Sequence, residues 1–407
     1  MKKCYITFLS LLSILVLSWF LPWLYSIIFP VGANDPFVAW SPVNNSFIIT
    51  ETADGGGNIH GIDNASRYTK EERDSLLPQI YYTQLAAREK MPDSIKGYEI
   101  TIPVFKHSQW VFTSSPRDIN KVNAKVYLMM ESMPERFELE DPDVVFRVNG
   151  NNDVEFIDIL SNKTDLGKTR RFNDIFNRNG FKFPIKSASA NVTTRKQYDE
   201  GYLLADNSGK LYHLKMQAGR PSMVKIDAPD SIIAEHVFIM ENADNRHLGL
   251  VIDSQNNLYA VEKERHNLVN LPVGKIDPEN QKFSIVKNLF NWVVKINEED
   301  GVRWIALDSD NYSVLGEYYR QYPESPILRA ASFIFPFQLS FTSVYDCVAK
   351  PRFSDFSANA IFLNIILAAA IIVIYRRRNK KFIAINAVTV LIFGIFAFIP
   401  LLIINEQ

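Results

Sequence analysis

Residues that could bind a metal or act as a nucleophile are scattered along this chain of 407 residues, and no known catalytic motif groups them. No two of the six histidines have the i, i+4 spacing of a helical zinc site, and none lies near a cysteine. The sequence also lacks the Gly-x-Ser-x-Gly turn that presents a serine nucleophile. The histidines are His60, His107, His213, His236, His247 and His266. These patterns identify no catalytic residue and no zinc site.

Acidic residues offer the other possible chemistry, because carboxylates bind hard cations and transfer protons. One short segment holds four of them, but Pro142 interrupts it, and a solvated loop is the simpler interpretation. Asp308 and Asp310 resemble half of a calcium loop, although the glycine and the final glutamate of such a loop are absent at the required offsets. The four acidic residues are Glu138, Glu140, Asp141 and Asp143. We therefore expect no bound metal and no cofactor.

Three segments of the chain share one sequence pattern. Each runs from an apolar stretch through a polar turn into a second apolar stretch, which predicts a β-hairpin. The leading aspartates, Asp206, Asp253 and Asp308, are separated by 47 and then 55 residues, close to one four-stranded propeller blade. The turn at Asp308 also resembles the aspartate box of sialidase-type propellers, without its Gly and Trp. The three segments are residues 203–212, 250–259 and 304–314.

Weaker versions of the pattern occur upstream, at residues 146–156 and 38–49, and a further strand pair is predicted around 110–112 and 126–128. Residues 34–350 hold room for about six blades of about 50 residues. We therefore predict a mainly β, propeller-like domain over this range. A sandwich or an irregular β domain is the alternative, because tight turns in any β fold share the same chemistry.

A helical insertion is predicted within this domain at residues 69–91. Thr69 and Glu72 form a capping-box pattern, apolar residues then recur at helical spacing, and Pro78 predicts a bend or a second helix start. The preceding glycine-rich segment, residues 54–61, lacks the Lys-Ser/Thr of a phosphate loop, so a surface loop is the favoured interpretation. A shorter helix is predicted over residues 170–177.

Three apolar runs predict transmembrane helices at residues 5–29, 358–375 and 382–404. A basic loop, residues 376–381, separates the last two, and short basic loops stay in the cytoplasm. This topology places residues 34–350 in the periplasm of a bacterial inner membrane, and the C-terminus outside as well. Residues 5–29 could also be a signal peptide, although their apolar stretch is longer than a signal core. The topology rests on Lys2, Lys3, Arg376, Arg377, Arg378, Lys380 and Lys381.

Charge and cysteine content agree with an outer domain that binds no nucleic acid. Seven of the 44 Lys and Arg residues are assigned to the cytoplasm, which leaves 37 outside against 44 of the 45 Asp and Glu residues. Nucleic-acid binding needs a basic face instead. Cys4 and Cys347 fall on opposite sides of the predicted membrane and cannot pair within one chain.

Small residues in the second and third apolar runs predict close helix packing against an integral membrane partner. No ionisable residue lies in the middle of any run, which favours an anchor over a transport path. The small residues are Ala368, Ala369, Ala370, Gly394 and Ala397.

The arrangement as a whole resembles an uncharacterised family of bacterial inner-membrane proteins with a large periplasmic β-rich domain. The likeness rests on the three apolar runs, on the stretch from Leu76 to Leu85 and on the segment from Pro92 to Ile95. It implies an accessory subunit associated with ABC-type transporters, and it supplies no catalytic residue.

The sequence thus favours a non-enzymatic, membrane-anchored accessory or binding subunit of an envelope complex. Its propeller-like domain would recognise protein, peptide or glycan, because the loops of every blade meet on one face. The alternative is a membrane-anchored periplasmic hydrolase or lyase.

Overall fold

The computed structural model describes residues 2–31, 35–51, 57–122, 124–151 and 153–404, without the side chains of residues 2–4. It divides into two compact units: the β unit, Asp35–Arg320, and the helical unit, Met1–Asn34 with Gln321–Gln407. The β unit is shorter than the predicted outer domain, because residues 321–350 belong to the helical unit. Asn34, the predicted first residue of that domain, lies outside the described residues, as do the side chains of Lys2 and Lys3.

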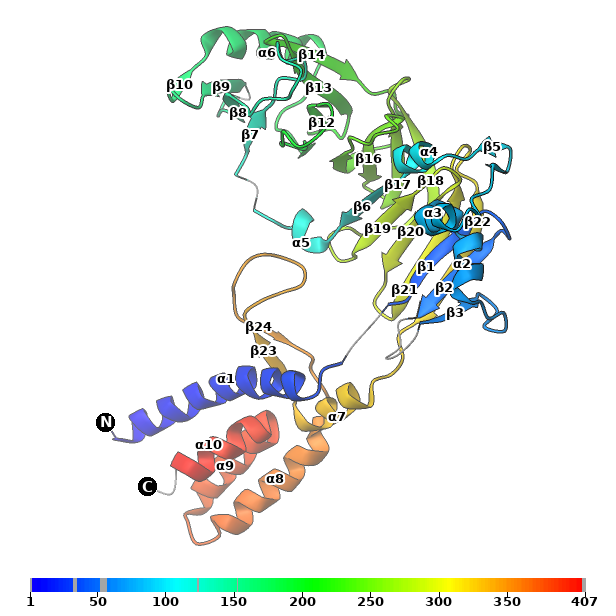
Figure 1. The fold of residues 1–407 in the computed structure, drawn as a ribbon. Helices are drawn as coiled ribbons and strands as arrows, with labels where there is room; N and C mark the ends of the chain where they lie inside the picture. The colour runs from blue at the N-terminus through cyan, green and yellow to red at the C-terminus, as the bar shows by residue number, and fades with distance from the viewer. Residues whose placement is uncertain (1, 32–34, 52–56, 123, 152, 405–407) are drawn as a thin grey trace. The chain divides into compact units, whose positions relative to one another are not determined.

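The β unit consists mainly of antiparallel sheets that follow one another along the chain (Figure 1). The first sheet contains β1 (Phe37–Ser41), β2 (Ser46–Glu51) and β3 (Asn58–Gly61). The second contains β7 (Val126–Met129), β8 (Val144–Val148), β9 (Val154–Asp158) and β10 (Lys163–Thr164). The third contains β11 (Ser187–Ser189), β12 (Tyr202–Ala205), β13 (Leu211–Gln217) and β14 (Arg220–Lys225).

The fourth and fifth sheets continue this order. The fourth contains β15 (Ala234–Ile239), β16 (His247–Asp253), β17 (Asn257–Glu262) and β18 (Asn267–Lys275). The fifth contains β19 (Phe283–Lys287), β20 (Asn291–Asn297), β21 (Gly301–Asp308) and β22 (Val314–Gln321). An earlier strand, β6 (Trp110–Ser114), joins the fifth sheet beside β19.

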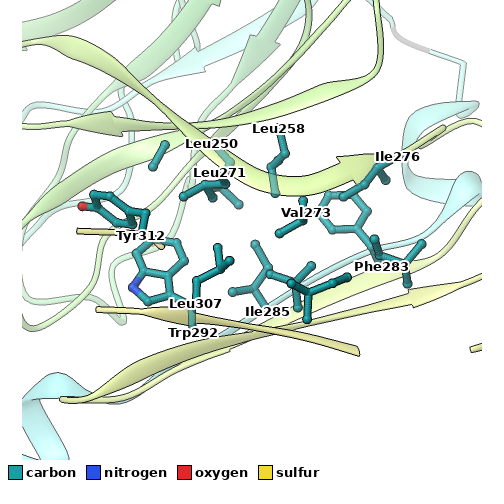
Figure 2. Close-up of a cluster of buried hydrophobic side chains, with 14 of the residues drawn as sticks. Leu250, Leu258, Leu271, Val273, Ile276, Phe283, Ile285, Trp292, Leu307 and Tyr312 are labelled. Atoms are coloured by element: carbon teal, nitrogen blue, oxygen red, sulfur yellow. The ribbon is translucent and has the colours of Figure 1, made fainter. Parts of the chain in front are cut away.

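From the second sheet to the fifth, each sheet shares a hydrophobic core with the next. The second and third sheets bury aromatic residues such as Phe146 and Tyr212 between them, and Leu203 and Val251 belong to the core of the third and fourth. The core shared by the fourth and fifth sheets includes Trp292 and Tyr312 at one end and Phe283 at the other (Figure 2). Propeller blades are arranged in this way: each blade is a four-stranded antiparallel sheet that packs on the next blade.

The predicted count of about six blades is wrong for the described residues, which form five such sheets, the first with three strands. None of these sheets closes on itself in the part of the chain that the structure describes. The count falls because residues 70–108 form helices and a short β4–β5 pair (Ser94–Ile95 and Tyr98–Glu99) instead of a blade.

All three predicted hairpins are confirmed. They are β12–β13, β16–β17 and β21–β22, and the first two occupy the middle of their sheets. The third lies one strand later in its sheet, which explains why its spacing is 55 residues instead of 47. The weaker hairpins at 38–49 and 146–156 are confirmed as β1–β2 and β8–β9.

The predicted pair of strands around 110–112 and 126–128 is wrong in its pairing. Both strands exist, but β6 pairs with β19 and β7 pairs with β8. Local sequence could not reveal the partner of β6, because that partner lies about 170 residues further along the chain. In the glycine-rich segment, residues 54–56 lie outside the described residues and Asn58–Gly61 forms β3.

The helical insertion is confirmed as α2 (Lys70–Leu76) and α3 (Pro78–Ala87). Thr69 and Glu72 make the reciprocal capping box, and Pro78 starts the second helix, where its missing N–H costs nothing. The helix predicted over 170–177 is longer, α6 (Leu166–Arg178). Two further short helices, α4 (Ile102–Ser108) and α5 (Pro116–Ile119), were not predicted.

The helical unit contains five helices and one strand pair among the described residues. Its longest helix packs along the last one, and α8 packs along α9 (Figure 1). The helices are α1 (Lys2–Ile28), α7 (Pro326–Ile334), α8 (Ala360–Ile374), α9 (Lys380–Phe393) and α10 (Ile395–Ile404). The strands are β23 (Gln338–Ser340) and β24 (Arg352–Ser354).

The prediction of three membrane-spanning helices needs correction, since only α1 among the described residues is long and apolar enough to span a bilayer by itself. The second apolar run forms α8, whose 15 residues extend about 22 Å, short of a hydrocarbon core of about 30 Å. The third run breaks at Gly394 into α9 and α10. A glycine within an apolar run is a weak local signal, so the break was missed.

The chain reverses direction at this break. Tyr375, at the end of α8, donates a hydrogen bond from its hydroxyl to the carbonyl of Leu401 near the end of α10 (2.8 Å), and its ring packs edge-on against Phe382 at the start of α9. The last described turn of α10 therefore lies at the same end of the bundle as the basic loop. A continuous third helix would have carried Leu401 to the opposite end.

Candidate functional site

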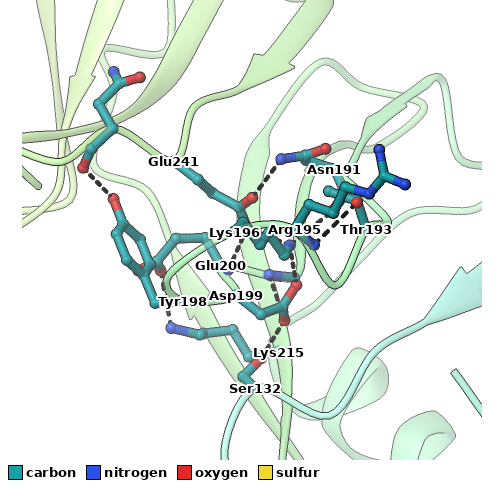
Figure 3. Close-up of polar contacts among 12 residues, drawn as sticks. Ser132, Asn191, Thr193, Arg195, Lys196, Tyr198, Asp199, Glu200, Lys215 and Glu241 are labelled. Atoms are coloured by element: carbon teal, nitrogen blue, oxygen red, sulfur yellow. Dashed lines mark hydrogen bonds and ion pairs between the residues drawn. The ribbon is translucent and has the colours of Figure 1, made fainter. Parts of the chain in front are cut away.

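The most unusual feature of the β unit is a set of charged side chains buried beside the β15–β16 loop, residues 240–246. We call it the ion-pair cluster (Figure 3). Three lysines and three carboxylates meet there. Three of the six come from the segment before β12, and the others come from β13, from the β15–β16 loop and from the turn after β17. Its members are Lys196, Asp199, Glu200, Lys215, Glu241 and Lys263.

Lys196 holds the β15–β16 loop to the segment before β12. Its ammonium group lies 2.6 Å from Asp199 Oδ1 and 2.7 Å from Glu241 Oε1, and it also donates to the carbonyl of Asn191. Asp199 accepts further hydrogen bonds from the Ser132 hydroxyl (2.5 Å) and from the backbone N–H of Gly201 (3.0 Å). Every oxygen of this carboxylate is therefore occupied.

Gly201 directly follows two acidic residues of the cluster, Asp199 and Glu200, which are 4% and 2% exposed. Gly201 has a φ of +62°, and a Cβ there would overlap the carbonyl of Leu214 in the neighbouring strand. Glycine accepts both constraints more easily than any other residue.

Glu200 binds both remaining lysines of the cluster. Lys263 Nζ lies 2.5 Å from its Oε1, and Lys215 Nζ lies 2.9 Å from its Oε2. Burial alone would raise the pKa of this carboxyl, but hydrogen bonds from His213, Lys263 and Lys215 outweigh burial and hold the pKa well below its usual range. Glu200 is therefore ionised at neutral pH and has no proton to donate as a general acid.

A second polar cluster follows the same loop toward the fifth sheet. His247 Nε2 lies 2.8 Å from the hydroxyl of Tyr312, and the histidine ring packs edge-on against Trp292. Lys287 forms an ion pair with Asp244 of the loop. Burial, with a smaller effect of the Arg246 charge, lowers the pKa of His247 to about 4, so this imidazole is neutral at physiological pH.

The three repeated aspartates stabilise turns. Asp206 and Asp253 accept hydrogen bonds from the backbone N–H groups two and four residues further along, and Asp308 accepts from those two and three residues further along. This is the geometry of Asx turns, which gives each hairpin a fixed reversal. The motif that suggested a cation site thus has a local structural role.

The acidic segment identified in the sequence is exposed. Glu138, Glu140, Asp141 and Asp143 all lie at the surface, and Asp143 pairs with Lys168 (3.4 Å). Among the residues that the structure describes, no three His, Cys, Asp or Glu side chains lie close enough together to hold a metal ion.

The small residues predicted to contact a partner fall into two groups. Ala368, Gly394 and Ala397 are buried inside the chain's own helical bundle. Ala370 is half-buried, and Ala369 is exposed on the outer face of α8. The structure thus leaves Ala369 accessible to another molecule, and it gives the three buried residues an intramolecular role.

The basic residues predicted to set the topology are exposed where the structure describes their side chains. Arg376, Arg377, Arg378, Lys380 and Lys381 all lie in or beside the turn between α8 and α9.

Comparison with known families covers most of the β unit. Residues 37–307 match a family described as a domain of unknown function (DUF4857), and this match spans two thirds of the chain. The chain belongs to the DUF4857 family. The matched residues begin with β1 and end in β21, so they contain the whole ion-pair cluster and all of the second cluster except Tyr312, and they exclude the helical unit.

Two solved structures resemble the DUF4857 chain in part. The "Structure of Dos1 propeller" is 11% identical with a TM-score of 0.28, and it covers 72% of this chain and 63% of its own. The "Crystal structure of Myceliophteria thermophila Cps50 (Swd1) beta-propeller domain" is 12% identical with a TM-score of 0.26, and it covers 54% of this chain and 60% of its own. The chain thus spans about six tenths of each structure. No curated protein matches the sequence.

Sequence analysis missed both polar clusters. The residues of the ion-pair cluster come from four separate segments, and Lys196 and Lys263 are 67 positions apart. No periodicity links them, because only the packing of the third sheet on the fourth brings them together. The one local signal was the run of two acidic residues before a glycine at 199–201.

Proposed function

We propose that this DUF4857 protein is a non-enzymatic, membrane-anchored accessory or binding subunit of an envelope complex. Its helical unit would lie in the bacterial inner membrane, and its β unit would recognise protein, peptide or glycan in the periplasm. The observation that carries the proposal is the apolar outer surface of the helical unit.

That surface would be unusual for a helical bundle in water. On α1, the buried residues Ile14, Ser18 and Pro22 form one stripe, while large apolar side chains around the rest of the helix are exposed. Helices α8 and α9 likewise expose apolar residues. A helix in water hides its apolar stripe and presents polar residues outward, whereas lipid favours the reverse. The exposed residues of α8 include Ile361, Phe362, Ile365, Ile366, Ile372 and Val373.

The distribution of charge supports an orientation. The basic loop and the end of α10 share one end of the bundle, and α1 packs on α10 in the opposite direction, so that the start of α1 lies toward the same end (Figure 1). By the positive-inside rule this end is cytoplasmic. We therefore propose that the C-terminus is cytoplasmic. The prediction from the sequence placed it outside, because that prediction assumed an unbroken third helix. The shorter helices accompany α1 in the bilayer, where local thinning accommodates a short apolar segment.

The polar clusters support binding over catalysis. In the ion-pair cluster, three lysines face three carboxylates at distances of 2.5–2.9 Å, so each charge is already neutralised by another. A catalytic acid needs a pKa near the working pH, and Glu200 is far from it. Such a network holds the β15–β16 loop in one conformation. A partner that binds the surrounding surface would then pay less entropy for ordering this loop.

We propose that the membrane partner is an integral membrane protein. The family resemblance implies that this protein is part of an ABC-type transporter. On the exposed face of α8, the small side chain of Ala369 lies between the larger side chains of Ile365 and Val373. A helix of the partner could approach closely at this position.

Topology mapping and purification test this function together. In a Cys4→Ser, Cys347→Ser background, a cysteine introduced at the exposed Leu160 of the β unit should react with a membrane-impermeant maleimide from the periplasmic side, and a C-terminal tag should react only after the inner membrane is opened. The protein should remain in the membrane pellet at alkaline pH and co-purify with a permease or an ATP-binding subunit. Recovery in the soluble fraction would contradict the anchor, and recovery from the membrane without any partner would contradict the accessory role.

A further inference from the structure

The β23–β24 hairpin exposes an unusual number of apolar side chains for so short a segment. Val344 is 71% exposed and Phe356 is 74% exposed, and four further aromatic or aliphatic residues nearby are also exposed. Exposed apolar residues in such density mark a surface that contacts another molecule or a membrane. We call residues 341–351, between the two strands, the hairpin loop. The further exposed residues are Phe341, Tyr345, Val348 and Phe353.

Helix α7 presents a similar surface directly before this hairpin. It is strongly amphipathic, none of its residues is fully buried, and Leu328 and Phe333 are exposed. Arg329 lies beside Leu328 on the exposed side. Apolar residues beside a basic residue on a short helix are typical of a segment that lies in the membrane interface.

The hairpin loop and α7 are tied to the aromatic end of α1. Phe341 packs edge-on against Trp19, with ring centroids 6.3 Å apart, and Trp19 stacks on Trp23. Close by, the Tyr25 hydroxyl donates a hydrogen bond to the carbonyl of Ile327 in α7 (2.9 Å). Tryptophan and tyrosine concentrate where a membrane helix passes through the headgroup layer. These contacts therefore hold the loop and α7 at the level of α1 where that layer would lie.

A further contact joins α7 to the start of α8. Asn359, directly before α8, donates a hydrogen bond from its side chain to the hydroxyl of Ser332 in α7 (3.3 Å). The segment from α7 to the hairpin loop therefore contacts both the aromatic end of α1 and the start of α8.

We propose that the hairpin loop and the exposed face of α7 insert into the outer headgroup layer of the same bilayer that holds α1. This inference rests on the proposed function. Val344, Tyr345 and Phe353 would lie among the upper acyl chains, and Arg329 and Lys350 would reach lipid phosphates. A lipid surface fits better than a protein partner because the hairpin loop joins the tryptophan-rich face of α1, where Phe341 packs against Trp19.

The native Cys347, which lies in the hairpin loop, makes the inference testable with few changes. In a Cys4→Ser variant, Cys347 is labelled with an environment-sensitive fluorophore, and the full chain is reconstituted into phosphatidylethanolamine–phosphatidylglycerol vesicles. Nitroxide-labelled lipids then report its depth. We expect a shift of the emission to shorter wavelength and strong quenching by nitroxides near the headgroup. The control label is placed at Leu160→Cys in a Cys4→Ser, Cys347→Ser background, because Leu160 is 95% exposed in a turn of the β unit. It should show neither effect.

A double substitution, Val344→Asp with Tyr345→Asp, should abolish the shift and the quenching at Cys347 while the protein stays in the membrane fraction. An unshifted and unquenched label on an integral protein would overturn the inference and leave the proposed function intact. A label that is exposed in pure lipid vesicles but protected in native membranes would also overturn it, because a protein would then cover the loop. Loss of the whole protein from the vesicles would contradict the proposed function itself.

Discussion

Gly394, at the junction of α9 and α10, packs directly against the side chain of Asn364 in α8. A Cβ at Gly394 would overlap Asn364 Oδ1, while Asn364 Nδ2 donates to the carbonyl of Leu391 (3.1 Å) one turn before the junction. Gly394 also has a φ of +57° and a ψ of −133°, a backbone conformation that is open essentially to glycine alone. This pair of residues therefore fixes the reversal that returns α10 toward the basic loop.

Replacement of Gly394 by alanine should destabilise the reversal by roughly 1–3 kcal/mol from backbone strain, in addition to the clash. Part of the population should then straighten α9 into α10. The measurement is the accessibility of a C-terminal tag on either side of the membrane, together with the melting temperature in detergent. Asn364→Ala in the same chain should relieve the clash and recover part of the stability. A melting temperature unchanged by Gly394→Ala would contradict the proposed role of the junction.

Glu200→Gln should destabilise the β unit, because Lys215 and Lys263 would lose the carboxylate that both of them bind. Removal of one member of a buried ion pair costs about 3 kcal/mol. Denaturant unfolding in detergent, followed by tryptophan fluorescence, measures this change. Glu264→Gln is the matched control, since Glu264 is exposed one residue after Lys263. Equal stabilities for the two variants would contradict the description of the cluster as a structural clamp.

Stability should depend on pH through His247. Its folded pKa of about 4 lies below the usual value of 6.5, so the unfolded state binds more protons between these two values. The free energy of unfolding should therefore decrease as the pH falls from about 6.5 to about 4, by up to roughly 3 kcal/mol from this residue. His247→Gln should lose this dependence.

The comparison that isolates His247 is the stability difference between the native chain and His247→Gln, measured at several pH values. This difference should shrink steadily as the pH falls below 6.5. A difference that stays constant from neutral to acidic pH would show that His247 is not the group responsible.

Asp308 should contribute to stability only through the turn that it caps. Asp308→Ala removes the acceptor for the N–H groups of Asp310 and Asn311 and should cost about 1 kcal/mol, while Asp308→Asn keeps that acceptor and should cost less. Thermal unfolding of both variants, with and without calcium, checks this. Stabilisation of the native chain by calcium that both variants lose would argue for a cation site instead.

Ala369 and Ala368 should respond differently to enlargement. Ala369→Leu adds volume on the exposed face of α8 and should weaken co-purification of a membrane partner without changing the melting temperature. Ala368→Leu adds volume inside the bundle and should lower the melting temperature itself, by an amount equivalent to about 1–3 kcal/mol. Partner recovery that is unaffected by Ala369→Leu would remove the proposed docking face.

The sequence by itself determined features that depend on near neighbours. The capping box of Thr69 and Glu72, the second helix start at Pro78 and the hairpins led by Asp206, Asp253 and Asp308 each form within a few residues, so their signals survive in the sequence. The apolar character of α1 is equally local.

The tertiary structure alone decided what depends on distant partners. Strand β6 joins β19 across about 170 residues, the ion-pair cluster gathers Lys196 and Lys263 from segments 67 positions apart, and Gly394 reverses the chain against Asn364 of another helix. Burial and long-range packing select these arrangements, and neither leaves a period or a spacing in the sequence. For the same reason, the apolar run at residues 382–404, which was predicted to form one helix, is divided between α9 and α10.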